Sequence, residues 1–253
     1  MRLRARWGAR KESLEVCATK MCAFLSELAM CDDMFAQQWI KCTCTREEAM
    51  TNPNEIELSV EALQNLLAKG RVRRDLDKSV VEELGYHSRQ LWNGRKLDSA
   101  FVLIECGAYP NPRILPAANT VWIDLPNDGS ALRRVLHPVK LRGITNVVVK
   151  NWDPDWARIS TNKLDSEVYQ VNGYLGQMAG WLTYISDRYG PLPPLPEDCA
   201  VERVGELGNL VTITSIRERL TVSNPAYVAA VRRLSEVLER AGFLAPIPPA
   251  KPT

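Results

Sequence analysis

Apolar side chains recur at helical spacing in the first third of the chain. Over residues 11–30 they fall at every third or fourth position, which predicts an amphipathic helix. A second helix should begin after Ser59, a residue type that caps helices, and end at Gly70. Residues 77–84, closed by Gly85, predict a third and shorter helix by the same reasoning.

Beyond this region the pattern changes to short apolar runs separated by turn residues, which is typical of strands. Residues 2–7 already show the alternation of polar and apolar positions that indicates a strand with one buried face. Further strands are predicted for six segments: residues 101–106, 121–125, 146–149, 181–185, 201–204 and 210–213.

Two helical segments interrupt this series of strands. One or two helical turns are expected over residues 130–136, ended by Pro138 because the residue before a proline disfavours the helical conformation. The last helix is better marked, since Asn224 can cap it, Pro225 suits its first position and Gly242 can end it.

Helices thus cluster early and strands late. This order predicts the α+β class, as a single domain with a mainly antiparallel sheet and flanking helices. The domain should cover residues 1–245, with residues 246–253 as a disordered tail. A stiff proline-rich connector at residues 191–196 is too short to argue for two domains.

A search for catalytic motifs leaves only scattered candidates. The sequence contains no Walker loop, no nucleophile elbow and no pair of histidines at the spacing of a zinc-binding helix. Glu105 and Asp124 lie on predicted strands and could share a proton or hold a metal ion if those strands are adjacent. His87 or His137 could complete such a site, so a metal-assisted hydrolase is one alternative function. We interpret all four residues as structural and expect neither catalytic residues nor a cofactor or metal.

Cysteine usage and hydropathy indicate the compartment. The seven cysteines are irregularly spaced, which argues against a disulfide framework, and we expect all of them to be reduced. Cys42 and Cys44 are too close together for the usual metal-binding pair. Neither a signal peptide nor an apolar run of membrane-spanning length is evident, which predicts a cytoplasmic protein.

Charge is unevenly distributed along the chain. The formal net charge of +2 gives no reason to expect nucleic-acid binding, yet residues 151–200 carry seven carboxylates against three basic side chains. This acidic segment opens with two aspartates between two tryptophans. Because aromatic anchors and steering charges are typical of protein interfaces, we predict a partner-binding site there. Its candidate residues are Trp152, Asp153, Asp155 and Trp156.

An ordered series of short motifs resembles one known family. In the C-terminal half these are Gly180-Trp181-Leu182-Thr183-Tyr184-Ile185-Ser186, Gly190-Pro191-Leu192-Pro193-Pro194-Leu195-Pro196, Leu210-Val211-Thr212-Ile213-Thr214 and Thr221-Val222-Ser223-Asn224-Pro225. Trp7-Gly8-Ala9-Arg10-Lys11-Glu12 and Leu91-Trp92-Asn93-Gly94 add an opening and a central motif. Together they resemble the immunity protein 52 family, antitoxins of bacterial polymorphic-toxin and type VI secretion systems.

The resemblance implies a protein that binds and silences a cognate toxin and has no active site of its own. It also implies that the partner is often a restriction-endonuclease-like nuclease delivered by type VI secretion. An inhibitor of a nuclease is often acidic, whereas this chain is slightly basic, so any charge mimicry would have to be local. A secretion-system adaptor is a further alternative.

Overall fold

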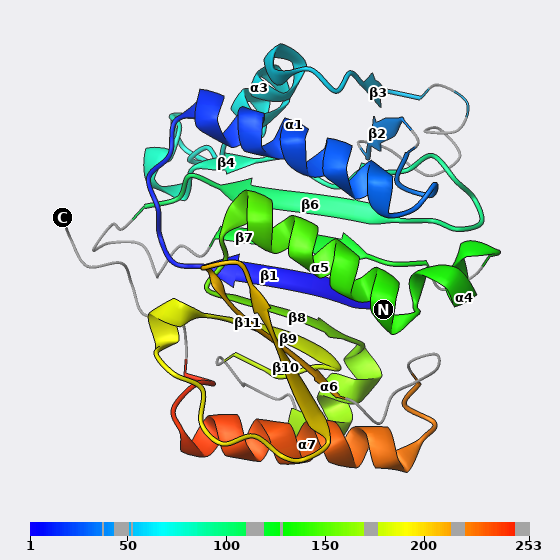
Figure 1. Cartoon of the computed structure of the whole chain (residues 1–253). Coiled ribbons are helices and arrows are strands. Elements are labelled where there is room, and N and C mark those ends of the chain that lie inside the picture. Colours follow the sequence, from blue (N-terminus) through cyan, green and yellow to red (C-terminus); the bar gives the residue numbers. More distant parts are fainter. Residues whose placement is uncertain are drawn as a thin grey trace.

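One antiparallel sheet runs through the whole fold (Figure 1). The computed structural model describes residues 1–36, 38–42, 51, 53–109, 119–126, 129–169, 177–213 and 221–245. Within them the sheet has eleven strands in the order β10-β11-β9-β8-β1-β7-β6-β5-β2-β3, with β4 beside β6. The strands are β1 Arg2–Trp7, β2 Trp39–Lys41, β3 Glu55–Ile56, β4 Tyr86–His87, β5 Leu91–Trp92, β6 Phe101–Cys106, β7 Asn119–Asp124, β8 Trp156–Ser160, β9 Leu182–Ser186, β10 Cys199–Val204 and β11 Gly208–Ile213.

Six α-helices flank this sheet in the described ranges, and the predicted α+β class with one domain is confirmed. The helices are α1 Leu14–Cys31, α3 Val60–Lys69, α4 Ala131–Val135, α5 Pro138–Trp152, α6 Asn162–Tyr169 and α7 Pro225–Arg240, with 3-10 turns at η1 Glu82–Leu84 and η2 Asp187–Tyr189. Two of the predicted caps are confirmed. The Ser59 side chain accepts a hydrogen bond from the Ala62 N–H, and Asn224 caps α7 in the same way.

The two faces of the sheet carry different helices. On one face α1 and α5 lie across the central strands, and Trp7 of β1 stacks on Trp152 of α5 with 5.7 Å between the ring centroids (Figure 1). On the other face Asp165 of α6 bonds Arg158 of β8, whose register partner on β1 is Arg4. α7 packs beside α6. The strand β1 therefore has its apolar side under α1 and α5 and its polar side on the face of α6.

Two predicted elements are wrong. Residues 146–149 are not a strand but lie inside α5, where Pro138 occupies the first turn and His137 is the cap. The run of apolar, mostly β-branched residues resembles a strand, but buried positions recur every three or four residues along the whole helix. Residues 77–84 form a turn, closed by Asp77 accepting from the Ser79 N–H and hydroxyl, with only the 3-10 turn η1 behind it.

Several elements were not predicted. β8 was missed because Arg158 interrupts its apolar pattern, although all five of its residues are buried. The helix α6 that follows β8 and the short strands β2 to β5 were missed as well, since each is too short or too polar to show a clear period.

The central motif around Asn93 is a buried turn. The Asn93 side chain donates to the Met34 and Asp98 carbonyl oxygens, at 3.1 and 2.9 Å, and accepts from the Ala100 N–H at 3.1 Å. It thus satisfies three backbone groups that have no partner in the sheet ladder. The motif positions the start of β6, which gives it a structural role.

The structure contains neither a disulfide nor a membrane-spanning helix within the described residues. The six cysteines in the described ranges are free, while Cys44 and the predicted tail at residues 246–253 lie outside those ranges. Every described helix is too short or too polar to cross a bilayer.

Candidate functional site

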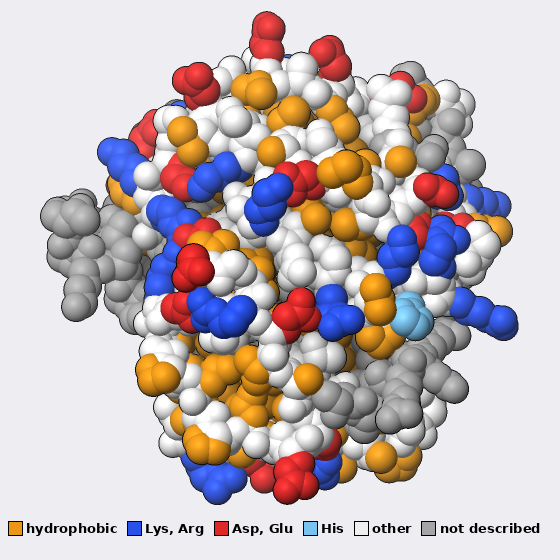
Figure 2. All heavy atoms as spheres, in the orientation of Figure 1, with side chains coloured by type: hydrophobic (Ala, Val, Ile, Leu, Met, Phe, Trp, Pro, Cys, Tyr) orange, Lys and Arg blue, Asp and Glu red, His pale blue; other side chains and the backbone are white. Residues whose placement is uncertain are grey.

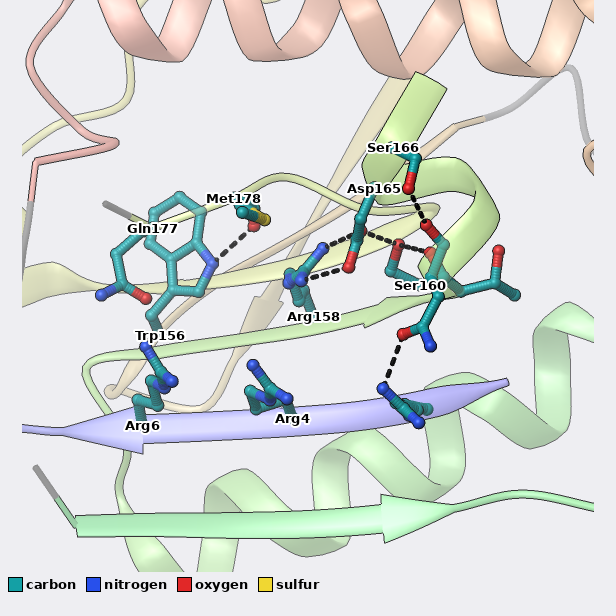
Figure 3. A pocket seen from close by; sticks show the side chains of 12 residues that line it. Arg4, Arg6, Trp156, Arg158, Ser160, Asp165, Ser166, Gln177 and Met178 are labelled. Atoms are coloured by element: carbon teal, nitrogen blue, oxygen red, sulfur yellow. Dashed lines mark hydrogen bonds and ion pairs between the residues drawn. The ribbon is translucent and has the colours of Figure 1, made fainter. Parts of the chain in front are cut away.

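A cationic cavity lies on the face of the sheet that carries α6 (Figure 3). It has a volume of about 380 Å³ and is formed by β1, β8, the start of α6 and residues 177–178. Its walls carry four guanidinium groups and one carboxylate, those of Arg2, Arg4, Arg6, Arg158 and Asp165. By contrast, acidic and basic side chains are interspersed over the face that carries α1 and α5 (Figure 2).

The alternation of β1 produces this concentration of charge. Successive side chains of a strand point to opposite faces, so Arg2, Arg4 and Arg6 share one face while the residues between them pack into the core. The neighbouring strand β8 adds Arg158 directly beside Arg4 in the register. The strand was predicted from its alternation, and the signal in the sequence for this cavity is that all three outward positions of the strand are arginine.

Two of the four arginines have charged partners. Arg158 forms a two-pronged ion pair with Asp165, with N···O distances of 2.5 and 2.8 Å, and the Ser160 hydroxyl donates to the same carboxylate. Arg2 pairs with Asp124 at 3.0 Å. These pairs hold Arg2 at one end of the arginine row and Arg158 beside its middle position.

Arg4 and Arg6 differ from them, because within the described residues neither side chain makes an ion pair or a hydrogen bond. Arg4 stacks on the Trp122 ring, with its Cζ 4.1 Å from the centroid. Burial, followed by the charges of Arg6 and Arg158, lowers the pKa of Arg4 to about 10. Burial and Arg158 also lower the pKa of Arg6, which Glu105 partly opposes. Arg4 therefore stays charged at neutral pH and keeps unused hydrogen-bond donors.

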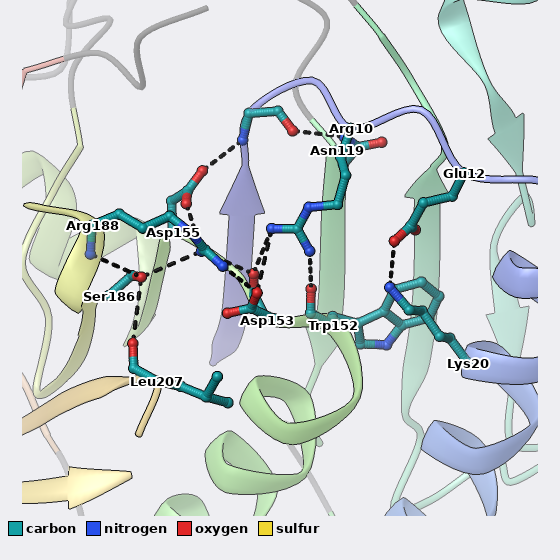
Figure 4. Close-up of polar contacts among 11 residues, drawn as sticks. Arg10, Glu12, Lys20, Asn119, Trp152, Asp153, Asp155, Ser186, Arg188 and Leu207 are labelled. Atoms are coloured by element: carbon teal, nitrogen blue, oxygen red, sulfur yellow. Dashed lines mark hydrogen bonds and ion pairs between the residues drawn. The ribbon is translucent and has the colours of Figure 1, made fainter. Parts of the chain in front are cut away.

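Three of the four predicted partner-binding residues lie outside this cavity (Figure 4), whereas Trp156 lines it. Trp152 is 0% exposed and Trp156 is 2% exposed, so both indoles belong to the core. Trp152 lies between Trp7 and Phe24, while Trp156 meets Tyr189 edge to face at 5.9 Å. While this packing holds, Trp152 is out of a partner's reach, and only the small exposed part of Trp156 lines the cationic cavity (Figure 3). Neither tryptophan is an exposed anchor in the folded chain.

The two aspartates of the segment join three parts of the chain (Figure 4). Asp153 ends α5 in the left-handed conformation, with φ 45°, and pairs with Arg10 and Arg188. Asp155 binds Arg188 at 2.8 Å and accepts from the Gly8 N–H at 2.7 Å. Their negative charges are thus balanced by two arginines.

The candidate catalytic residues are dispersed, with one exception. His87 Nε2 lies 2.9 Å from Glu105 Oε1 across β4 and β6. Asp124 is opposite Phe101, four positions from Glu105 along β6, or about 13 Å at the rise of a strand. His137 caps α5. The described residues contain no group of three or more potential metal ligands.

The fold and the cavity define an α+β protein with a charged recess suited to binding. The family model described as immunity protein 52 matches residues 3–247, and the chain belongs to this family. The predicted resemblance is therefore confirmed.

Comparison with solved structures adds a likeness in fold. The Pseudomonas aeruginosa T6SS protein PA0821 aligns with a TM-score of 0.53 and 11% identity, over 93% of this chain and 72% of that chain. At this identity the likeness concerns the fold alone. No curated protein matches the sequence.

Proposed function

We propose that this immunity protein binds a nuclease effector of a type VI secretion system in the cytoplasm and blocks it stoichiometrically. The observation that carries the proposal is the family match over residues 3–247. The T6SS protein with a similar fold supports the secretion context. The hydrolase alternative has the His87–Glu105 contact in its favour, but Asp124 lies far along the sheet and is paired with Arg2.

Co-expression with the product of the neighbouring reading frame tests this function. We expect the two proteins to co-purify in a fixed ratio and the toxicity of that product to be suppressed. The variants His87→Ala, His137→Ala, Glu105→Gln and Asp124→Asn should protect cells as well as the wild-type chain wherever they fold. Loss of protection in a folded histidine variant, together with turnover by the wild-type protein, would establish the hydrolase instead.

Asp153 and Asp155 remain candidate contacts at the edge of the toxin interface. Asparagine tolerates the left-handed conformation at position 153, but at position 155 its single carbonyl oxygen can accept only one of the two bonds that the carboxylate accepts through separate oxygens. Asp153→Asn with Asp155→Asn therefore removes charge and loosens the contacts to Arg188, so the melting temperature of the variant is measured first. If these charges steer the toxin, association should slow by up to about threefold at low salt and recover as salt rises. Stopped-flow measurements with Asp187→Asn as the control check this, and equal rates at low salt would exclude the aspartates.

A further inference from the structure

We propose that the cationic cavity between β1, β8 and α6 receives carboxylate side chains of the toxin. The inference rests on the proposed function, because it assumes that the partner is a toxin, and it adds the surface and the chemistry of the contact. Arg4 and Arg6 are its key residues, while Arg2 lies beyond Arg4 on β1 and Arg158 lies opposite Arg4 on β8.

The free protein leaves charge in this cavity uncompensated. Arg4 and Arg6 are partly buried beside two further guanidinium groups, and neither has a counter-ion among the described residues. Like charges that are removed from water destabilise one another. A carboxylate entering the cavity would offset this repulsion and accept paired hydrogen bonds from a guanidinium group. The arrangement is thus complementary to an anion that the described part of the chain does not itself supply.

The surface beside the cavity has the composition of a protein interface. Trp122 points outward from β7, directly opposite Arg4 in the register, and both Arg2 and Arg4 stack on its ring. Leu103 of β6 is the next residue in the same cross-strand row. Tryptophan and arginine are the residue types that contribute most to binding energy at interfaces. Stacking also holds the Arg4 side chain in place before the partner arrives.

Acidic neighbours make a nucleic acid a poor occupant. Asp124 pairs with Arg2 at one end of the arginine row, Asp165 pairs with Arg158 beside its middle position, and Glu105 of β6 raises the pKa of Arg6. A phosphate backbone carries one charge after another and needs a continuous basic track, which these carboxylates interrupt. A cavity of about 380 Å³ has room for a few side chains instead. The inhibitor would therefore offer a basic recess to an acidic group of the toxin. This is the reverse of an acidic inhibitor that imitates DNA.

Binding of the full chain to the toxin encoded by the neighbouring reading frame tests the proposal. The double variant Arg4→Gln with Arg6→Gln keeps most of the side-chain length and removes both charges. Arg74→Gln with Arg133→Gln is the matched control, since it removes two exposed positive charges elsewhere. We expect the cavity variant to raise Kd about tenfold or more, and the control to leave it within about twofold. The lysine variant Arg4→Lys with Arg6→Lys should lie between them, because it keeps the charge and loses the planar donor pair.

Stability separates a binding role from a structural one. Because the wild-type arginines repel each other, the cavity variant should melt no earlier than the control variant, even though its binding is weaker. The single variants Arg4→Gln and Arg6→Gln carry the same comparison if the double variant fails to fold. The Kd of the double variant Arg4→Gln with Arg6→Gln should also respond less to added salt than the Kd of the wild-type chain.

The possible outcomes are distinct. If the wild-type chain does not bind the toxin, the proposed function fails and this inference fails with it. If the wild-type chain binds and the cavity variant has the same Kd as the control, only the cavity is excluded. A single-stranded oligonucleotide that binds the wild-type chain and displaces the toxin, with both effects lost in the cavity variant, would make nucleic acid the occupant and overturn the proposal.

Discussion

Replacement of Trp152 by alanine is expected to lower the free energy of unfolding by about 3–5 kcal/mol. The indole is fully buried at the end of α5, where it stacks on Trp7 and meets the edge of Phe24. Its removal leaves a large cavity between α5, α1 and the sheet, since aromatic neighbours held by other contacts relax only in part. Urea denaturation followed by circular dichroism measures the effect.

Trp122→Ala is the matched control, because it makes the same substitution on the outward face of the sheet. Trp122 is only partly buried and has arginines on its ring in place of core side chains. We expect a much smaller loss of stability there, about 1 kcal/mol, from the lost stacking and packing. Affinity for the toxin should show the opposite order, with Trp122→Ala weakening binding and folded Trp152→Ala retaining it. Equal stability losses at the two positions would contradict this placement of the tryptophans.

Local patterns sufficed for elements that begin and end with distinct residues. α3 follows from Ser59 and Gly70, and α7 follows from Asn224 and Pro225, since these residues act on backbone groups within one turn. Residues 146–149 show the limit of such reasoning. A short apolar run fits a buried strand and a buried helix equally well, and only the longer series of buried positions along α5 decides between them.

The candidate site was harder to predict because it depends on the pairing of strands that are distant in the sequence. A tryptophan next to an aspartate has the composition of an exposed anchor, but Trp152 is placed over β1 by the packing of α5 on the sheet. The arginine row of β1 was visible in the sequence. What could not be seen is that β8 pairs with β1 and sets Arg158 beside Arg4, so that a polar strand face becomes a cavity.

The two faces of the sheet around β1 thus differ in what their side chains do. The face under α1 and α5 holds the stacked pair Trp7 and Trp152, and the Asp153–Arg188 cluster lies at the end of α5. The face of β1 that carries the arginines contributes little to the core and keeps uncompensated charge. Natural proteins often retain such locally unfavourable groups where a partner binds. Substitutions on the first face should thus act on stability, and substitutions on the second on affinity.

Replacement of Gly180 by alanine is the second change for which we expect a large effect, a loss of about 3 kcal/mol in stability. Gly180 opens the motif that leads into β9. A Cβ atom at this position would lie 2.2 Å from the carbonyl oxygen of Ile159 in β8. That oxygen cannot move freely, because it accepts the Trp181 N–H at 3.0 Å. The methyl group must therefore push the entry of β9 away from β8.

Gly143→Ala in α5 provides the matched control for this substitution. No atom lies within 4 Å of the Cβ position at Gly143 apart from its own helix and chain neighbours. Alanine in the middle of a helix is favoured over glycine by about 0.5–1 kcal/mol, so this variant should be slightly more stable than the wild-type chain. Thermal and urea denaturation of the two variants should therefore move in opposite directions. If Gly180→Ala unfolds at the same denaturant concentration as Gly143→Ala, β8 does not approach the Gly180 backbone as closely as described. Steric fit would then not explain the glycine at the start of this motif.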